Sequence, residues 1–317
     1  MDPSPFLRGN PYPGTKRVPY PRAKPGDGRL PGDTWFMATY PAGVRLELLG
    51  DAEALEVTYR ASEVQPGWPA DTGRAFEVWR GDERVAVETA QAGEHTATLK
   101  LGAGEGPVVV HLPERLAPTI LDVAPSGGAI EPAARGPRWL CYGDSIAEGW
   151  IASGPGLAWP AIASRAHGLD VMNMGYAGAC RGELVSAEQL AELEADVITL
   201  SHGTNCHNRV PFSTGLMRET YQAFLDILRQ GHPDTPIVVV SPVLRPDAET
   251  TPNRLGASLA DLRAVIEEVA RARGLPLVAG EPIITSAMLA DEVHPNDAGM
   301  RAIAAAVGPV VAEAVRG

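Results

Sequence analysis

The first half of the chain has short apolar segments separated by Gly and Asp turn signals. Several of them alternate with a period of two; in VRLELLG, for example, Val44, Leu46 and Leu48 share one face. Evenly spaced, alternating segments of this kind predict an antiparallel β-sandwich. The strands are expected at residues 34–40, 44–50, 54–61, 74–80, 84–90, 95–101 and 107–113.

After Arg138 the pattern changes to strands that alternate with helices. DVITLS and PIVVVSP are continuous apolar runs, which is typical of strands covered on both faces. Two sets of apolar residues follow helical spacing. This order predicts a parallel sheet between two layers of helices, a three-layer α/β/α domain. Strands are expected at 138–143, 169–174, 196–202, 236–242 and 276–280, and helices over Leu255, Leu259, Leu262, Ile266 and Val269, and over Met300, Ile303, Ala304, Val307 and Val311.

Two segments lack either pattern. Residues 1–33 are rich in Pro and Gly, and we expect an extended arm that wraps on the surface or is partly disordered. PSGGAIEPAARGP, residues 125–137, reads as a linker. The expected organisation is therefore an arm (1–33), a smaller all-β sandwich with its linker (34–137) and an α/β domain (138–317).

Composition excludes several classes of function. The chain of 317 residues carries a net charge of −12 and no Lys/Arg block, so neither nucleic acid nor an anionic membrane is an expected partner. No apolar run is long enough for a membrane span or a signal peptide, so we expect a cytoplasmic protein. Three scattered cysteines suit neither a disulfide framework nor a metal site. Composition leaves the oligomeric state open.

The first candidate for chemistry is Ser145, which follows the first strand of the α/β domain in GDSIAEG. Ligands of such sheets bind beyond the carboxyl ends of the strands, so this serine is placed where substrates bind. The other interpretation is a helix N-cap, a common role of serine.

A serine nucleophile needs a base, and the base needs an orienting acceptor. Asp291 and His294 stand three residues apart in DEVHPNDAG, just before the last expected helix, where they can meet each other and face a strand end. Alone, the same segment would be read as a surface turn with a helix cap.

Acyl transfer also needs donors for its oxyanion. Gly178 in MNMGYAGAC and Asn205 in SHGTNCHN each follow an expected strand. Gly178 lets a backbone N–H approach a ligand without a side chain in the way, and Asn205 offers an amide donor. The alternatives are a turn glycine and a turn asparagine.

Taken together, these residues resemble the SGNH (GDSL-type) hydrolase family over about residues 138–317. Ser145 matches the nucleophile, Asp291 and His294 match its partners, and the Ser145 N–H, Gly178 and Asn205 match the oxyanion donors. The resemblance implies a flavodoxin-like α/β/α fold and ester hydrolysis through an acyl-enzyme, without cofactor or metal. Cys206 stands where the family often has Asp after the Asn, which affects loop support and not the donor. The first half loosely resembles the β-sandwich that precedes this domain in some carbohydrate esterases and tailoring acyltransferases.

Other residues near these motifs have more than one interpretation each. Trp150 can wall an acyl pocket or belong to the core. His207 can touch substrate, bind a metal or be a hydrogen-bonded loop residue, and the last is favoured because no Asp, Glu or Cys set at ligand spacing joins it. Cys180 and Cys206 follow the two oxyanion motifs and can lie close together, although a reducing compartment disfavours a disulfide.

Three functions are consistent with the sequence. The first is a serine esterase on a small or medium acyl ester, such as an acylated sugar or natural product. The second keeps the same residues but passes the acyl group to an alcohol, as in secondary-metabolite tailoring. The third is a carbohydrate-binding protein with a vestigial catalytic domain. The complete set of motifs argues against the third, and we rank the esterase first. The sequence names neither the acyl group nor the alcohol.

Overall fold

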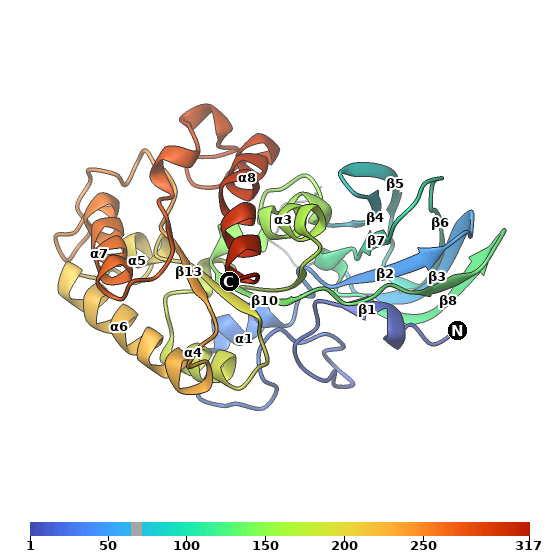
Figure 1. The fold of residues 1–317 in the computed structure, drawn as a ribbon, viewed down its shortest axis with the longest axis horizontal. Coiled ribbons are helices and arrows are strands. Elements are labelled where there is room, and N and C mark those ends of the chain that lie inside the picture. Colours follow the sequence, from blue (N-terminus) through green and yellow to red (C-terminus); the bar gives the residue numbers. More distant parts are fainter. Residues whose placement is uncertain (65–71) are drawn as a thin grey trace.

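The computed structural model describes residues 1–64 and 72–317. These residues form two lobes, an α/β lobe and a β lobe, that lie side by side (Figure 1). In this part of the chain no helix has the length and apolar character needed to cross a bilayer.

The α/β lobe is built on a sheet whose strands are all parallel and run in the order β11-β10-β12-β13-β14. This order, 2-1-3-4-5, is that of flavodoxin-like folds. The sheet therefore confirms the predicted fold class and the five expected strand positions. The strands are β10 (Arg138–Gly143), β11 (Asp170–Gly175), β12 (Val197–Ser201), β13 (Ile237–Val240) and β14 (Leu277–Val278).

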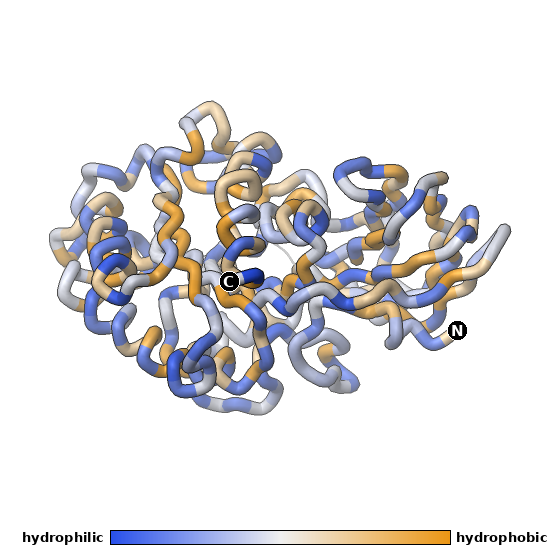
Figure 2. The backbone as a smooth tube through the Cα atoms, in the orientation of Figure 1, coloured by the Kyte–Doolittle hydropathy of each residue, from blue (hydrophilic) through white to orange (hydrophobic). Residues whose placement is uncertain are grey.

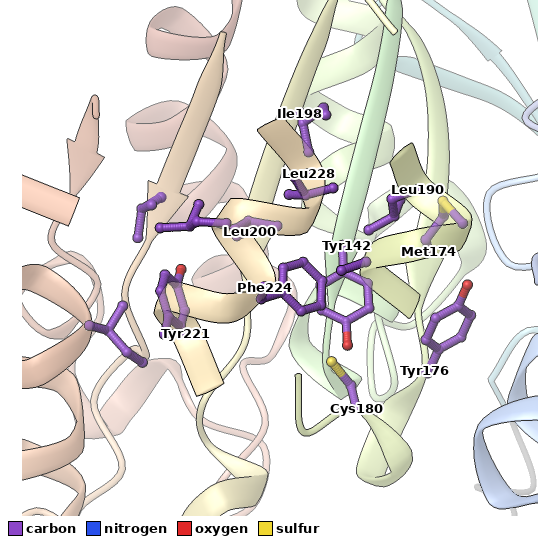
Figure 3. Packing of buried hydrophobic residues seen from close by; sticks show 14 of the residues in the cluster. Tyr142, Met174, Tyr176, Cys180, Leu190, Ile198, Leu200, Tyr221, Phe224 and Leu228 are labelled. Carbon is purple, nitrogen blue, oxygen red and sulfur yellow. The ribbon is translucent and has the colours of Figure 1, made fainter. Parts of the chain in front are cut away.

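Helices cover both faces of this sheet, because side chains of each strand alternate between two cores. Trp139 and Cys141 of β10 face the core under α3 and α8, whereas Leu140 and Tyr142 face the core under α4, α6 and α7. Figure 3 shows the second core, where Tyr142 packs against Phe224 with ring centroids 4.9 Å apart. The helices are α3 (Trp159–His167), α4 (Leu184–Ala191), α6 (Thr214–Gly231), α7 (Leu259–Ala272) and α8 (Asp297–Ala314), with the short helices α2 (Ser145–Glu148) and α5 (Asn205–Asn208).

The β lobe is the expected sandwich of two antiparallel sheets. One sheet has the order β1-β2-β7-β4-β5, with β9 also paired to β2, and the other has the order β6-β3-β8. A single core lies between them. The central strands of both lobes are hydrophobic stretches of the chain (Figure 2). The strands are β1 (Leu7–Arg8), β2 (Arg45–Gly50), β3 (Ala54–Ala61), β4 (Ala75–Arg80), β5 (Glu83–Thr89), β6 (Gly93–Lys100), β7 (Val108–His111), β8 (Thr119–Ser126) and β9 (Ile130–Pro132).

The strand predicted at 34–40 is wrong, because this segment contains helix α1 (Gly32–Ala38). Pro31 precedes the helix and Asp33 lies in its first turn, both of which favour a helix start. Met37 and Ala38 are buried in the core of the α/β lobe. Docking onto this core therefore overrides the strand propensity of the aromatic and β-branched residues.

Two further boundaries differ from the prediction. The linker expected at 125–137 begins inside β8 and contains β9, whose residues pair with β2 because the chain passes along that open edge. The helix expected over Leu255 begins at Leu259, where Ser258 and Asp261 form a capping box. Leu255 lies in the preceding loop and is exposed.

The N-terminal segment is more than a surface arm. Its longer part has no regular structure, as expected, but the side chain of Arg22 is fully buried. The guanidinium donates to the carbonyl oxygens of Tyr40 (2.6 Å) and Met37 (2.7 Å), and to those of Asn173 and Gly175 in β11. The segment thus joins α1 to the parallel sheet.

Candidate active site

Ser145 lies at the carboxyl end of β10, as predicted, and is the first residue of α2. Gly143 allows the preceding strand to approach β12, because a Cβ at this position would lie 2.5 Å from the carbonyl oxygen of Ser201. The buried Asp144 carboxylate caps α2 by accepting from the Ile146 N–H at 3.0 Å. Asp144, not Ser145, is thus the N-cap, which leaves the serine hydroxyl available for chemistry.

His294 connects Ser145 to Asp291. Its Nε2 atom lies 2.9 Å from Ser145 Oγ, and its Nδ1 atom lies 2.8 Å from Asp291 Oδ2. Asp291 Oδ1 accepts the backbone N–H groups of Val293 (2.7 Å) and His294 (2.6 Å). Ser145 lies 146 positions before Asp291 in the sequence, yet the structure brings it together with Asp291 and His294. The hydrogen bonds join the three side chains in the order found in serine hydrolase triads.

The environment of Asp291 favours its ionised form. Burial alone would raise the pKa of this carboxyl group, but the hydrogen bonds from the His294 ring and from the His294 and Val293 backbone outweigh it and lower the pKa below its usual value. An ionised Asp291 accepts a hydrogen bond from His294 and so holds the ring proton on Nδ1. The free lone pair then lies on Nε2, facing the hydroxyl of Ser145.

Gly178 and Asn205 lie beside the serine on two neighbouring loops. Gly178 is in the 3₁₀ turn Ala177–Ala179 after β11, and Asn205 begins α5 after β12. Among the described residues, the backbone N–H groups of Ser145 and Gly178 have no protein acceptor, so both are open to a bound oxygen.

The Asn205 amide makes two hydrogen bonds to main-chain carbonyl groups. Its Nδ2 atom donates to the carbonyl oxygens of Ala177 (2.8 Å) and Cys180 (2.9 Å). Both amide hydrogens are thus used to hold the Gly178 turn against α5. Donation to an oxyanion would require one of these two bonds to exchange for the ligand.

A cavity of 440 Å³ opens over Ser145 and His294. Trp150 forms part of its wall, and its ring centroid lies 6.5 Å from that of His294. Helix α1 supplies a second wall, although the sequence assigned this segment to the sandwich. The lining residues are Asp33, Phe36, Met37, Ser145, Trp150, Ala177, Gly178, Ala179, Asn205, Asn208, Arg209, Arg245, Val293 and His294.

Comparison with known proteins identifies the family. The sequence model of the GDSL-like lipase/acylhydrolase family matches residues 141–302, about half of the chain. This chain belongs to that family. Among curated protein sequences, none matches the chain.

Solved structures are similar to this chain over most of its length. The salicylyl-acyltransferase SsfX3 from a tetracycline biosynthetic pathway is 26% identical, with a TM-score of 0.79 over 95% of this chain and 92% of that one. A candidate GDSL-like lipase of Bacteroides ovatus is 22% identical (TM-score 0.80; 98% and 96% covered). A family two carbohydrate esterase of Clostridium thermocellum, solved with cellohexaose, is 15% identical (TM-score 0.61; 84% and 90% covered). The last two likenesses concern the fold alone.

Not every candidate residue reaches the cavity of this GDSL-like protein. His207 is buried, and its Nε2 atom lies 2.7 Å from the carbonyl oxygen of Thr251, so it holds a loop and does not line the cavity. Cys180 and Cys206 are both buried free thiols in one core. No group of three or more His, Cys, Asp or Glu side chains at metal-binding distance occurs in the described parts of the chain.

The sequence did not point to several residues that line the cavity. Arg209 and Arg245 follow α5 and β13, and thus lie at the same edge of the sheet as Ser145. Their position after strands of the parallel sheet is the one feature of the sequence that indicates a place near the site. Phe36 and Met37 had no such signal, because nothing in the sequence places α1 against the α/β lobe.

The β lobe reaches the base of the site through Arg115. Its guanidinium donates to Glu148, the last residue of α2, at 3.0 Å, and lies over the Trp150 ring at 4.6 Å from the centroid. Arg22 approaches the other carboxylate oxygen of Glu148 at 3.6 Å. Two arginines from outside the α/β lobe therefore hold the short helix that begins with Ser145.

Proposed function

We propose that this protein is a serine esterase that cleaves an acyl ester through an acyl-enzyme on Ser145. The observation that carries the proposal is the hydrogen-bonded chain of Asp291, His294 and Ser145 at the base of a cavity. The family and its solved structures support ester chemistry, since they include esterases and an acyltransferase.

In the first half of the reaction, Nε2 of His294 takes the proton of the Ser145 hydroxyl while Oγ attacks the ester carbonyl. The oxyanion that forms can accept hydrogen bonds from the free N–H groups of Ser145 and Gly178. When the tetrahedral intermediate collapses, the ester C–O bond breaks and His294 gives its proton to the leaving alcohol. In the second half, water replaces the alcohol and the same steps release the acid.

The cavity suits a medium or aromatic acyl group or alcohol better than a bare acetyl group. Its 440 Å³ lie within the range of sites for small molecules, about 300–1,000 Å³. Phe36, Met37, Trp150 and Val293 give it apolar and aromatic walls. Such walls gain free energy by burying an apolar group of the substrate.

A second candidate function is transfer of the acyl group to an alcohol. It is favoured by the likeness to the salicylyl-acyltransferase over 95% of this chain. It is also favoured by α1, which covers one side of the cavity and can limit the access of water to an acyl-enzyme. Both functions use the same triad and differ in the second nucleophile.

Labelling and product analysis test both candidates. A fluorophosphonate probe should label the wild-type protein and not Ser145→Ala, and 4-nitrophenyl butyrate should be hydrolysed by the wild type alone. Labelling that persists in Ser145→Ala would refute the assignment of the nucleophile. New ester formed when alcohols are added at fixed donor concentration would establish transfer; hydrolysis without new ester across a panel of sugar and phenolic alcohols would reject it.

A further inference from the structure

Arg209 lies at the edge of the catalytic cavity. It follows α5 directly, and its side chain lines the same cavity as Ser145 and His294. The guanidinium rests on the Gly178 turn: a Cβ built on Gly178 would lie 3.0 Å from Cζ of Arg209 and 3.2 Å from its Nε and Nη1 atoms. The positive charge is therefore close to the N–H that is expected to face the reacting carbonyl.

The other charged side chains of the cavity wall, apart from the catalytic histidine, have partners. Asp33 accepts two hydrogen bonds of 3.0 Å from Arg181, and Arg245 donates two hydrogen bonds of 2.9 Å to Asp247. By contrast, the side chain of Arg209 makes no hydrogen bond or ion pair within residues 1–64 and 72–317. In a chain with a net charge of −12, the cavity that holds the candidate nucleophile thus also has an uncompensated positive charge on its wall.

A guanidinium group is charged at every physiological pH and presents a planar set of donors. It fits carboxylate and phosphate groups, which can accept two of these hydrogen bonds at once. A neutral apolar ester offers no such acceptor beyond its own carbonyl.

We propose that Arg209 is a specificity-determining residue that binds an anionic group, a carboxylate or phosphate, of the ester substrate. The inference rests on the proposed function, because it places this group relative to the ester cleaved at Ser145. The anionic group belongs to the acyl portion or to the alcohol portion of the ester, and paired substrates distinguish the two.

The kinetic test compares esters that differ in one carboxylate. For the acyl side, the pair is 4-nitrophenyl pentanoate and mono-4-nitrophenyl glutarate; for the alcohol side, it is phenyl acetate and 4-carboxyphenyl acetate. In one of these pairs, Arg209→Met should lower kcat/KM for the anionic ester by about tenfold or more, mainly by raising KM. For the neutral ester of the same pair, kcat/KM should stay within about twofold of the wild-type value. Added salt should weaken the preference of the wild type.

Arg254→Met is the matched control, since Arg254 is also an exposed loop arginine but does not line the cavity. This variant should leave kcat/KM unchanged for all four substrates. Equal losses for both members of each pair, or no loss for any of them, would overturn the inference and show that Arg209 only packs against the Gly178 turn.

A binding experiment separates this inference from the proposed function. In the Ser145→Ala background, which cannot turn over esters, monomethyl glutarate and methyl 4-carboxyphenyl ether should bind more tightly than methyl pentanoate and anisole in the corresponding pair. Adding Arg209→Met should abolish the difference, as measured by calorimetry or NMR titration. If neutral esters are not hydrolysed but this difference in binding persists, the proposed ester hydrolysis is wrong and the proposed anion site at Arg209 is supported. If neutral esters are hydrolysed and no difference is found, the reaction stands and the anion site is wrong.

Discussion

Arg115 of the β lobe and Glu148 of α2 form an ion pair of 3.0 Å, with side chains that are 3% and 0% exposed. Glu148 ends the single helical turn that Ser145 begins. The pair therefore links the sandwich directly to the helix of the candidate nucleophile. Its energetic consequences differ from those of a surface pair, because both charges are removed from water.

Loss of one partner of this pair should destabilise the protein strongly. Arg115→Met leaves Glu148 buried with Arg22, at 3.6 Å, as its remaining ion-pair partner in the described part of the chain, and we expect the free energy of unfolding to fall by about 3 kcal/mol. Arg60 and Glu94 form a matched exposed pair at 2.8 Å, and Arg60→Met should cost less than about 1 kcal/mol. Urea denaturation measures both. If both variants lose a similar free energy of unfolding, burial of the Arg115–Glu148 pair does not increase the cost of removing one partner.

The two partners of Ser145 should differ in importance. His294→Ala removes the base and should reduce kcat about as much as Ser145→Ala, because the two residues act as a unit. Asp291→Asn should cost less, since it impairs the orientation and charge of the ring but keeps the base. Steady-state kinetics on a 4-nitrophenyl ester decide this. A His294→Ala variant that keeps kcat within about tenfold would show that another base acts.

Asn205→Ala should lower kcat by roughly 10²–10³ with little change in KM, if the amide turns to the oxyanion during the reaction. Since the same amide holds the carbonyls of Ala177 and Cys180, the variant should also be less stable, by about 1 kcal/mol for each lost hydrogen bond. Kinetics should therefore be measured well below the melting temperature. An effect on stability or KM alone would assign Asn205 a supporting role.

Glu114 should make stability depend on pH. Burial raises its pKa to about 7, although the Gly43 N–H and the nearby positive charges of Arg115 and Arg22 oppose this shift. The folded state thus binds the proton more tightly than the unfolded chain, whose group has a pKa of 4.5. The stability that comes from this proton is complete below about pH 4.5 and is lost as the pH rises to about 7.

The variant Glu114→Gln stays neutral and should lack this dependence. Relative to it, the wild type should lose about 3 kcal/mol between pH 4.5 and pH 8, at about 1.4 kcal/mol for each unit of the shift. Denaturation at the two pH values measures the difference. Parallel pH profiles for the two proteins would show that Glu114 ionises normally.

The parts of the site that could be predicted from the sequence lie at the ends of parallel strands. Ser145, Gly178 and Asn205 follow β10, β11 and β12, and a sheet of this kind gathers such ends at one edge. The apolar strands are recognisable because they are covered on both faces, so their positions follow from composition alone. Local sequence and global fold agree in this half of the chain.

The parts that could not be predicted depend on contacts between segments that are not neighbours in the sequence. Phe36 and Met37 line the cavity only because α1 docks on the α/β lobe, and the apolar pattern of that segment fits a strand equally well. Arg22 and Arg115 are buried, whereas charged residues are expected at the surface unless their partners are known. Those partners are main-chain carbonyls and a glutamate far away in the sequence, which leave no pattern around either arginine.

The hydrogen bonds of Arg22 also set an order of events during synthesis. Its guanidinium binds carbonyl oxygens of Asn173 and Gly175, 151 and 153 residues further along the chain. When the β lobe has left the ribosome, β11 has not yet folded to present these acceptors, so Arg22 cannot dock until this strand has formed. The closing of such a long loop becomes favourable only once the sheet is present to receive it. A residue near the start of the chain therefore reaches its final position only after a strand from the second half has folded.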